Sequence, residues 1–160
     1  MEREIDRYLN LLERRLDTLR QLATQLKASQ EAYTAMDLDR ITYYINYQEN
    51  LCSEIRSFDD QIRQLHKSLC DALHQELDLA APDSLMAHLD ERAQRRLKVV
   101  TQGLANIQAD VKRLNRIQAE LLKRSRRSIN ALINLMSQYT CRFELQPALV
   151  PAGMAVEVKE

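Results

Sequence analysis

The sequence has few residues that interrupt helices: two glycines, three prolines and no tryptophan among its 160 residues. Leu, Ala, Glu, Gln and Arg, which favour helices, are abundant instead. This composition predicts an all-α protein, and the length is that of one ordinary domain.

Long apolar runs are also missing from the sequence. No uninterrupted stretch approaches the about 18 apolar residues that cross a bilayer, and the first residues, MEREIDRY, are charged, unlike the apolar core of a signal peptide. The three cysteines, an odd number without paired spacing, fit reduced thiols better than a disulfide framework. We therefore expect a soluble, cytoplasmic protein without membrane insertion.

Recognisable catalytic and phosphate-binding motifs are absent as well, because the sequence has no glycine-rich phosphate loop and no Ser-His-Asp or Cys-His pattern. His66, Cys70 and His74 are spaced by four and would form one row on a helix, with Asp71 or Asp78 as an oxygen ligand for zinc. Such spacing arises by chance on long helices, so we interpret the row as residues on the helix flank. We expect no enzyme activity, no cofactor and no metal.

Apolar residues recur at alternating spacings of three and four along three segments, a pattern typical of long helices that pack side by side. The first seam comprises Ile5, Leu9, Leu12, Leu16, Leu19, Ala23, Leu26 and Tyr33. The second comprises Ile41, Tyr44, Gln48, Leu51, Ile55, Phe58, Ile62, Leu65, Leu69 and Ala72. The third comprises Leu97, Val100, Leu104, Ile107, Val111, Leu114, Gln118, Leu121, Ser125, Ser128, Leu132, Leu135 and Tyr139. Gly103 and polar Gln118 are expected to weaken the middle of the last helix.

The breaks between these seams predict how the chain folds back on itself. Either Asp37 or Asp39 can cap a new helix after a tight turn, and Pro82 separates the second helix from a short connecting one. We predict an all-α fold: an elongated, antiparallel, three-helix, coiled-coil-like bundle with a short connecting helix and a flexible C-terminal tail. The predicted bundle is residues 1–139, with helices at about 3–35, 39–77, 84–89 and 91–139, and the predicted tail is residues 140–160.

Charge is distributed unevenly, although the formal net charge is zero. Residues 1–91 hold 10 Lys and Arg against 18 Asp and Glu, whereas residues 92–127 hold 11 against 2. The basic stretch could bind nucleic acid, or it could attract acidic neighbour helices within the bundle. Because its basic residues avoid the seam and lack interleaved aromatics, we favour a solvated, partly ion-paired face and expect no nucleic-acid partner.

Four of the six tyrosines, Tyr33, Tyr43, Tyr44 and Tyr47, surround the first predicted turn. They could offer a surface to a partner protein, or they could close the end of the bundle. Tyr33 and Tyr44 continue the seams of their helices, so we favour closure of the bundle end.

The last helix ends in a broad apolar arc, within the stretch RSINALINLMSQY at residues 127–139. Ile133 and Met136 lie beside the seam, and Asn130 and Asn134 mark the remaining polar edge. The candidate binding residues of this arc are Ile129, Leu132, Ile133, Leu135, Met136 and Tyr139. Burial within the bundle, against a second copy or against an amphipathic helix of another protein would each cover the arc.

Three parts of the sequence share their pattern with one known family. They are LLERRLDTLRQLATQLKASQEAYTAMDLDRITYYINYQENLCSEI, with Glu31 before the turn and Glu49 before Leu51; the break at Pro82; and LNRIQAELLKRSRRSINALINLM, with Asn115, Leu121 and Leu122. Together they resemble the FlgN-like family of flagellar export chaperones over about residues 5–139. The sequence departs from that family at Gln48, where lysine is common, and at Tyr139-Thr140, where a tyrosine-glycine pair is common.

The resemblance implies a cytoplasmic, non-enzymatic chaperone that binds the amphipathic terminal helix of hook-filament junction (hook-associated) proteins. It would prevent their premature assembly and deliver them to the type III export apparatus. The apolar arc and the tail would hold this cargo. The alternative is a structural coiled-coil or adaptor protein that self-associates through the same arc without cargo, and a homo-oligomer is compatible with either interpretation.

Overall fold

α-Helices form all the regular structure in the residues that the computed structural model describes, which are residues 2–73 and 83–144. The helices are α1 (Glu2–Ala35), α2 (Leu38–Leu73), the short α3 (Asp83–Met86) and α4 (Glu91–Glu144). The all-α prediction is confirmed. The chain divides into two units, residues 1–122 and 123–160. We call the described part of the first unit the bundle and that of the second unit, residues 123–144, the terminal segment.

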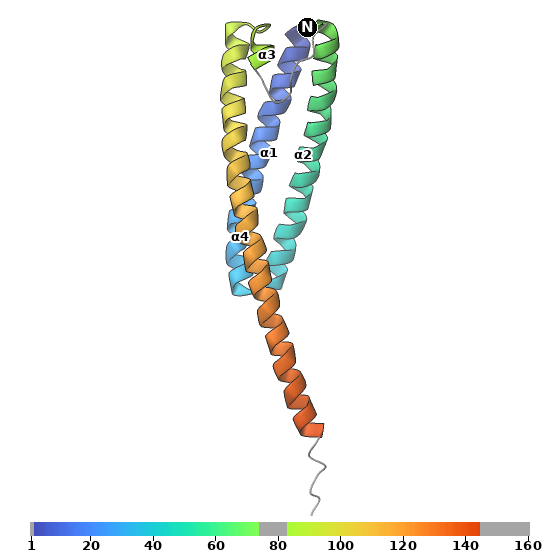
Figure 1. The fold of residues 1–160 in the computed structure, drawn as a ribbon, viewed down its shortest axis with the longest axis vertical. Helices are drawn as coiled ribbons and strands as arrows, with labels where there is room; N and C mark the ends of the chain where they lie inside the picture. The colour runs from blue at the N-terminus through green and yellow to red at the C-terminus, as the bar shows by residue number, and fades with distance from the viewer. Residues whose placement is uncertain (1, 74–82, 145–160) are drawn as a thin grey trace, which may run out of the picture. The chain divides into compact units, whose positions relative to one another are not determined.

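In the bundle, α1 and α2 form an antiparallel hairpin, and the first part of α4 runs alongside it (Figure 1). A shared apolar core joins these helices and the short α3. Its buried members include Leu9, Leu12, Leu16, Phe58, Ile62, Leu69, Leu85, Leu97, Val100 and Leu104. Each such side chain contributes about 1.5–3 kcal/mol when it moves from water into the core.

α1 buries a wider stripe than its predicted seam, because Tyr8, Leu11 and Leu22 are buried as well. This helix contacts both of the other long helices. Arg15 Nε lies 2.6 Å from Asp59 Oδ1 of α2, and other side chains of α1 meet α4. A helix with two neighbours needs a broader apolar face than a helix with one.

Gly103 lets α4 approach α1 closely. A Cβ atom at this position would lie 2.8 Å from Cδ2 of Leu16, nearer than van der Waals contact allows. The missing side chain therefore makes room for a buried leucine of α1. Gly103, which was expected to weaken the last helix, is therefore a packing contact. The burial of Leu16 against it offsets the lower helix propensity of glycine.

A layer of polar side chains crosses the bundle near the α1–α2 turn. The Gln118 side-chain amide of α4 donates to the Tyr33 hydroxyl at 3.0 Å and to Oε1 of Gln48 in α2 at 3.2 Å. Gln48 donates in turn to the Ser29 hydroxyl of α1 at 3.3 Å. Ser29, Tyr33 and Gln48 are buried. The two glutamines that interrupt the seams thus bind each other and hold three helices in one register.

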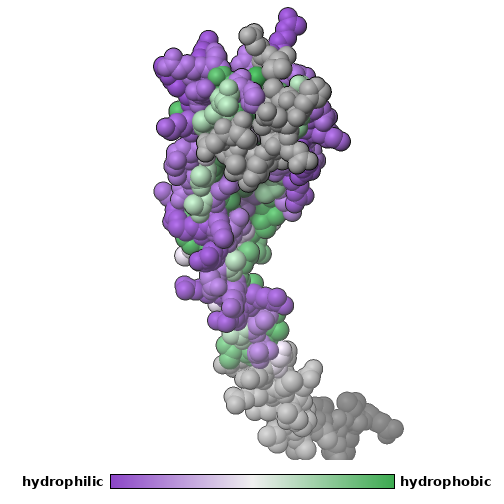
Figure 2. Space-filling model, turned by 45° about the horizontal axis from the view of Figure 1, so that its top comes forward, coloured by the Kyte–Doolittle hydropathy of each residue, from purple (hydrophilic) through white to green (hydrophobic). Residues whose placement is uncertain are grey.

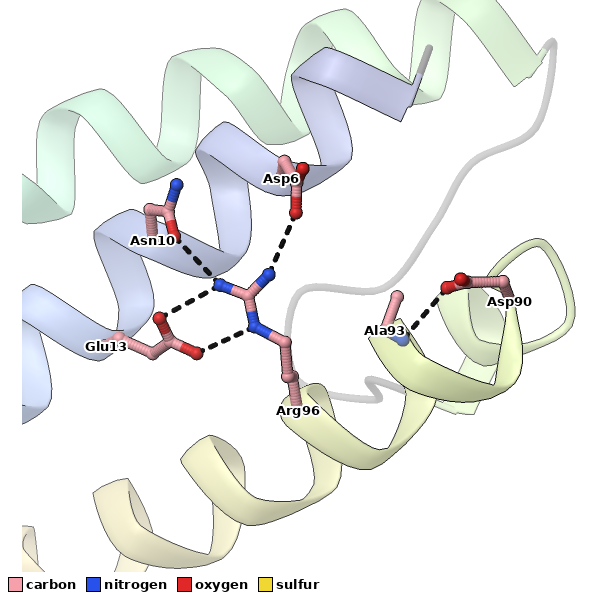
Figure 3. A network of polar contacts seen from close by, with 6 residues as sticks. All are labelled: Asp6, Asn10, Glu13, Asp90, Ala93 and Arg96. Atoms are coloured by element: carbon pink, nitrogen blue, oxygen red, sulfur yellow. Dashed lines mark hydrogen bonds and ion pairs between the residues drawn. The ribbon is translucent and has the colours of Figure 1, made fainter.

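Charge also connects α4 to α1, as Figure 3 shows. The Arg96 guanidinium donates to the two carboxylate oxygens of Glu13 at 3.0 Å each, to Asp6 at 2.8 Å and to Asn10 at 2.8 Å. The hydrogen bonds to Glu13, the largest cause, raise the pKa of Arg96 above its ordinary value. Part of the basic stretch therefore attracts an acidic neighbour helix, one of the two roles considered for it.

The α1–α2 turn consists of Met36 and Asp37. Met36 has a left-handed backbone with φ of 55°, and the Asp37 amide donates to the Ala32 carbonyl at 3.1 Å, which closes α1. The Asp37 carboxylate accepts a hydrogen bond from the Arg40 amide at 3.1 Å and caps α2. Asp37 is therefore the cap of the two candidates, and α2 begins at Leu38.

The connecting helix α3 ends at Met86, three residues earlier than predicted. The reason is that Asp90 caps α4 by accepting a hydrogen bond from the Ala93 amide at 2.9 Å (Figure 3). The chain has to leave the helical conformation before this cap, so residues 87–89 form turns. Leu85 of α3 and Leu89 of the turn are both buried in the core.

The other helix ends also differ from the predicted bounds. α4 continues to Glu144 rather than ending at Tyr139, because no glycine or proline follows until Pro147. The predicted helical residues 74–77 and the predicted tail beyond Glu144 lie outside the described residues.

Replacement of Gln118 by alanine tests the polar layer. The Gln118→Ala variant should lower the free energy of unfolding by about 1–3 kcal/mol, because buried polar groups of Tyr33 and Gln48 lose their partner. Urea denaturation measures this difference. The exposed Gln108→Ala in the same helix is the control and should change stability by less than about 0.5 kcal/mol. Equal effects of the two substitutions would contradict a structural role of the layer.

Enlargement of Gly103 tests the close approach of α1 and α4. The Gly103→Leu variant should lose about 1–3 kcal/mol of unfolding free energy through overpacking against Leu16, whereas Ala109→Leu, at an exposed position of α4, should not. Combination with Leu16→Ala should recover part of the loss, because the two side chains compete for one space. Strict additivity in thermal and urea denaturation would show that the two sites are independent.

Candidate partner-binding surface

The apolar arc predicted in the last helix lies in the terminal segment, and its side chains are exposed there. The exposed fractions are 41% for Ile129, 58% for Leu132, 55% for Ile133, 51% for Leu135 and 71% for Met136. Tyr139 lies within α4, but its side chain is outside the described part of the structure. Hydrophobic and hydrophilic side chains lie next to each other on the surface of this segment in Figure 2.

The spacing of these residues on α4 determines the width of the arc. At 3.6 residues per turn, the six candidates from Ile129 to Tyr139 cover about 160° of the helix circumference. Asn130 and Asn134 occupy the polar side and are exposed. An arc of this width exceeds the narrow seam of a two-stranded contact and is typical of a helix that buries its face in a groove or against two helices.

Basic side chains precede the apolar arc. Lys123, Arg124, Arg126 and Arg127 are exposed, and the sequence has no Asp or Glu between Glu120 and Glu144. Some basic side chains earlier in α4 pair with carboxylates: Arg95 with Glu91, Arg96 with Glu13 and Arg113 with Asp110. Among the described residues, Lys123, Arg124, Arg126 and Arg127 form no ion pair. The arc is therefore bordered by positive charge.

The four tyrosines near the first turn have two different environments. Tyr33 is buried in the polar layer and Tyr44 is half-buried, as their seam positions predicted. Tyr43 and Tyr47 are 61% and 36% exposed. The predicted closure of the bundle end therefore applies to Tyr33 and Tyr44 only. Tyr43 and Tyr47 lie outside the seam, and this was the sequence signal for their exposure.

His66 lies in the core rather than on the helix flank, which corrects the prediction for this residue. It is buried, its ring centroid lies 6.5 Å from that of Tyr8, and its Nδ1 lies 3.6 Å from the Cys70 sulfur. The seam of α2 widens here because the helix also covers Tyr8 of α1. His74 is outside the described residues, and the described ones contain no group of three or more potential metal ligands.

The polar groups of the bundle interior have structural contacts. Burial raises the pKa of Tyr8 and Tyr33, so both phenols stay neutral, and the Tyr33 hydroxyl accepts a hydrogen bond from Gln118. A groove of about 530 Å³ beside Tyr8 contains Arg15 and Asp59, which bind each other. This ion pair stabilises the contact between α1 and α2.

Comparison with known proteins identifies the family of the chain. The model of the family described as FlgN protein matches residues 1–142, nearly the whole chain, and the resemblance predicted from the sequence is confirmed. No curated protein and no solved structure matches the chain significantly. Among the described residues, no helix is both long enough and apolar enough to cross a membrane. The chain belongs to the FlgN family of flagellar export chaperones, which is a family of chaperones rather than enzymes.

Proposed function

We propose that this protein is a cytoplasmic chaperone that binds the amphipathic terminal helix of hook-associated flagellar proteins. In this function it prevents the premature assembly of the cargo and delivers it to the type III export apparatus. The observation that carries the proposal is the exposure of large apolar side chains from Ile129 to Met136 on one arc of α4. Membership of the FlgN family supports the same function.

The proposed contact is a helix packed against a helix. An amphipathic cargo helix would place its apolar stripe on the arc and remove both surfaces from water, which contributes about 25 cal/mol for each Å² of apolar surface. A cargo segment that is disordered before binding loses about 2–5 kcal/mol in becoming ordered. The net affinity is therefore moderate, which suits a chaperone that has to release its cargo at the export apparatus.

The charge around the arc indicates which amphipathic helices fit best. By their spacing on α4, Arg124 and Arg126 border the arc on its two sides, and both are exposed. A cargo helix with acidic residues beside its apolar stripe would meet opposite charge at both edges. A basic cargo helix would meet like charge, so the border of the arc contributes to cargo selection.

Acidic substitutions within the arc test the proposed contact. The double variant Ile133→Asp with Met136→Asp should weaken binding of a synthetic peptide of the hook-associated terminal helix about 100-fold or more, because two charges would have to be buried. Titration calorimetry measures the affinity. The helix content measured by circular dichroism should remain unchanged, because both side chains are exposed within one copy of the chain.

A matched control places the same two charges on the polar edge of the same helix. Asn130→Asp with Asn134→Asp should retain peptide binding. If both double variants lose binding equally, charge rather than the arc determines affinity. If the arc variant unfolds instead, the arc is part of the core. An oligomer that ignores the peptide would favour the structural coiled-coil alternative over the chaperone.

A further inference from the structure

A second exposed surface lies on α2, just after the α1–α2 turn. Tyr43 and Tyr47 are one helical turn apart. On the same face of α2, exposed Asp39 lies one turn before Tyr43 and exposed Glu54 lies two turns after Tyr47. We call these four residues the tyrosine stripe. The Tyr43 and Tyr47 rings are stacked at 6.3 Å, with 22° between their planes. The stripe therefore presents two neighbouring aromatic rings with a carboxylate on either side of them along the helix.

Tyrosine at an exposed position is suited to an interface because it provides a large contact area, a hydrogen-bonding hydroxyl and little conformational entropy to lose. Tyr43 also makes an edge contact with the half-buried Tyr44 at 5.5 Å. This contact ties the exposed ring to one that belongs to the bundle. The surface is thus held in place before any partner arrives, which lowers the entropic cost of binding.

The surroundings of the tyrosine stripe are negatively charged. Residues 31–54 contain five Asp and Glu and one basic residue, Arg40. Arg40 is already engaged, since its guanidinium lies 3.5 Å from Glu31 Oε2, and a hydrogen bond with Tyr44, the largest cause, raises its pKa. A partner of the stripe is therefore expected to carry positive charge beside an apolar or aromatic-binding face.

The same chain contains a surface with these properties. The terminal segment combines the apolar arc with Arg124 and Arg126 at its two borders, and among the described residues neither arginine has an ion-pair partner. Arginine guanidinium groups bind carboxylates and also stack on tyrosine rings. The arc could cover the rings of the stripe while its two arginines bring positive charge to the acidic surroundings of the stripe.

We propose that, in the absence of cargo, two copies of this protein pair reciprocally, with the terminal segment of each copy on the tyrosine stripe of the other. Two-fold symmetry makes both contacts at once, so each dimer buries two arcs and two stripes and leaves no open end for further growth. This pairing does not depend on the proposed function. If the proposed function is also correct, cargo would have to displace the second copy from the arc.

The mass of the full-length protein tests the pairing directly. Sedimentation equilibrium of the protein alone should show a dimer at about 0.1 M salt that dissociates more readily at about 1 M, where charges more than about 3 Å apart are screened. The Tyr43→Ser with Tyr47→Ser variant should raise the dissociation constant about tenfold or more. Val99→Ser, which removes another exposed apolar side chain of the bundle, should leave it unchanged. A monomer under all conditions would overturn the proposal.

Charge reversal identifies the two surfaces as partners of each other. One variant carries Asp39→Lys with Glu54→Lys, and a second carries Arg124→Glu with Arg126→Glu. Each alone should be monomeric, because like charges then meet at both contacts. An equal mixture should form a dimer of one copy of each, in which both contacts again join opposite charges. A mixture that stays monomeric would overturn the assignment of these surfaces, provided that circular dichroism shows both variants folded.

Addition of the hook-associated peptide separates this proposal from the proposed function. Conversion of the dimer into a complex of one protein and one peptide supports both. A dimer that does not bind the peptide supports pairing and contradicts the chaperone function. A monomer that binds the peptide supports the chaperone function and contradicts pairing.

Discussion

The packing of α1 against both α2 and α4 is the contact on which the rest of the bundle depends. The apolar sides of α1 contribute to two buried clusters shared with α2 and α4, and polar contacts join the same helices. Each of these contacts requires α4 to lie at one axial position on α1. Leucine seams alone would tolerate a shift by one heptad, but a shift would separate Gln118 from Gln48 and Arg96 from Glu13.

Much of the bundle was predictable from the sequence because its determinants are local. Seam spacing identified the long helices and most of their buried residues, and the aspartates near residue 37 indicated a cap. The burial of Tyr8, Leu11 and Leu22 was not predictable in this way, because spacing does not show how many neighbours a helix has. The role of Gly103 depends on Leu16, which is 87 residues away in the sequence. Helix propensity describes only the local free-energy cost of placing a glycine in a helix.

The candidate surface shows the same division between local and tertiary information. The width of the apolar arc and the basic residues beside it could be read from helical spacing, whereas the exposure of the arc could not. A periodic pattern indicates that a face is apolar, not what covers it. Tyr43 and Tyr47 illustrate this limit: their positions outside the seam separate them from Tyr33 and Tyr44, but the sequence does not show how far each ring is exposed.

The turn at Met36 and Asp37 is short, so the contacts between α1 and α2 nearest the turn are between residues that are close in sequence. Contacts between such segments require the closure of small loops and form early, whereas those with α4 close loops of about 80 residues and form later. A nascent chain would therefore emerge from the ribosome with the α1–α2 hairpin ready and its α4-binding face still empty. Until α4 has been synthesised, that face is the part of the molecule most in need of protection from aggregation.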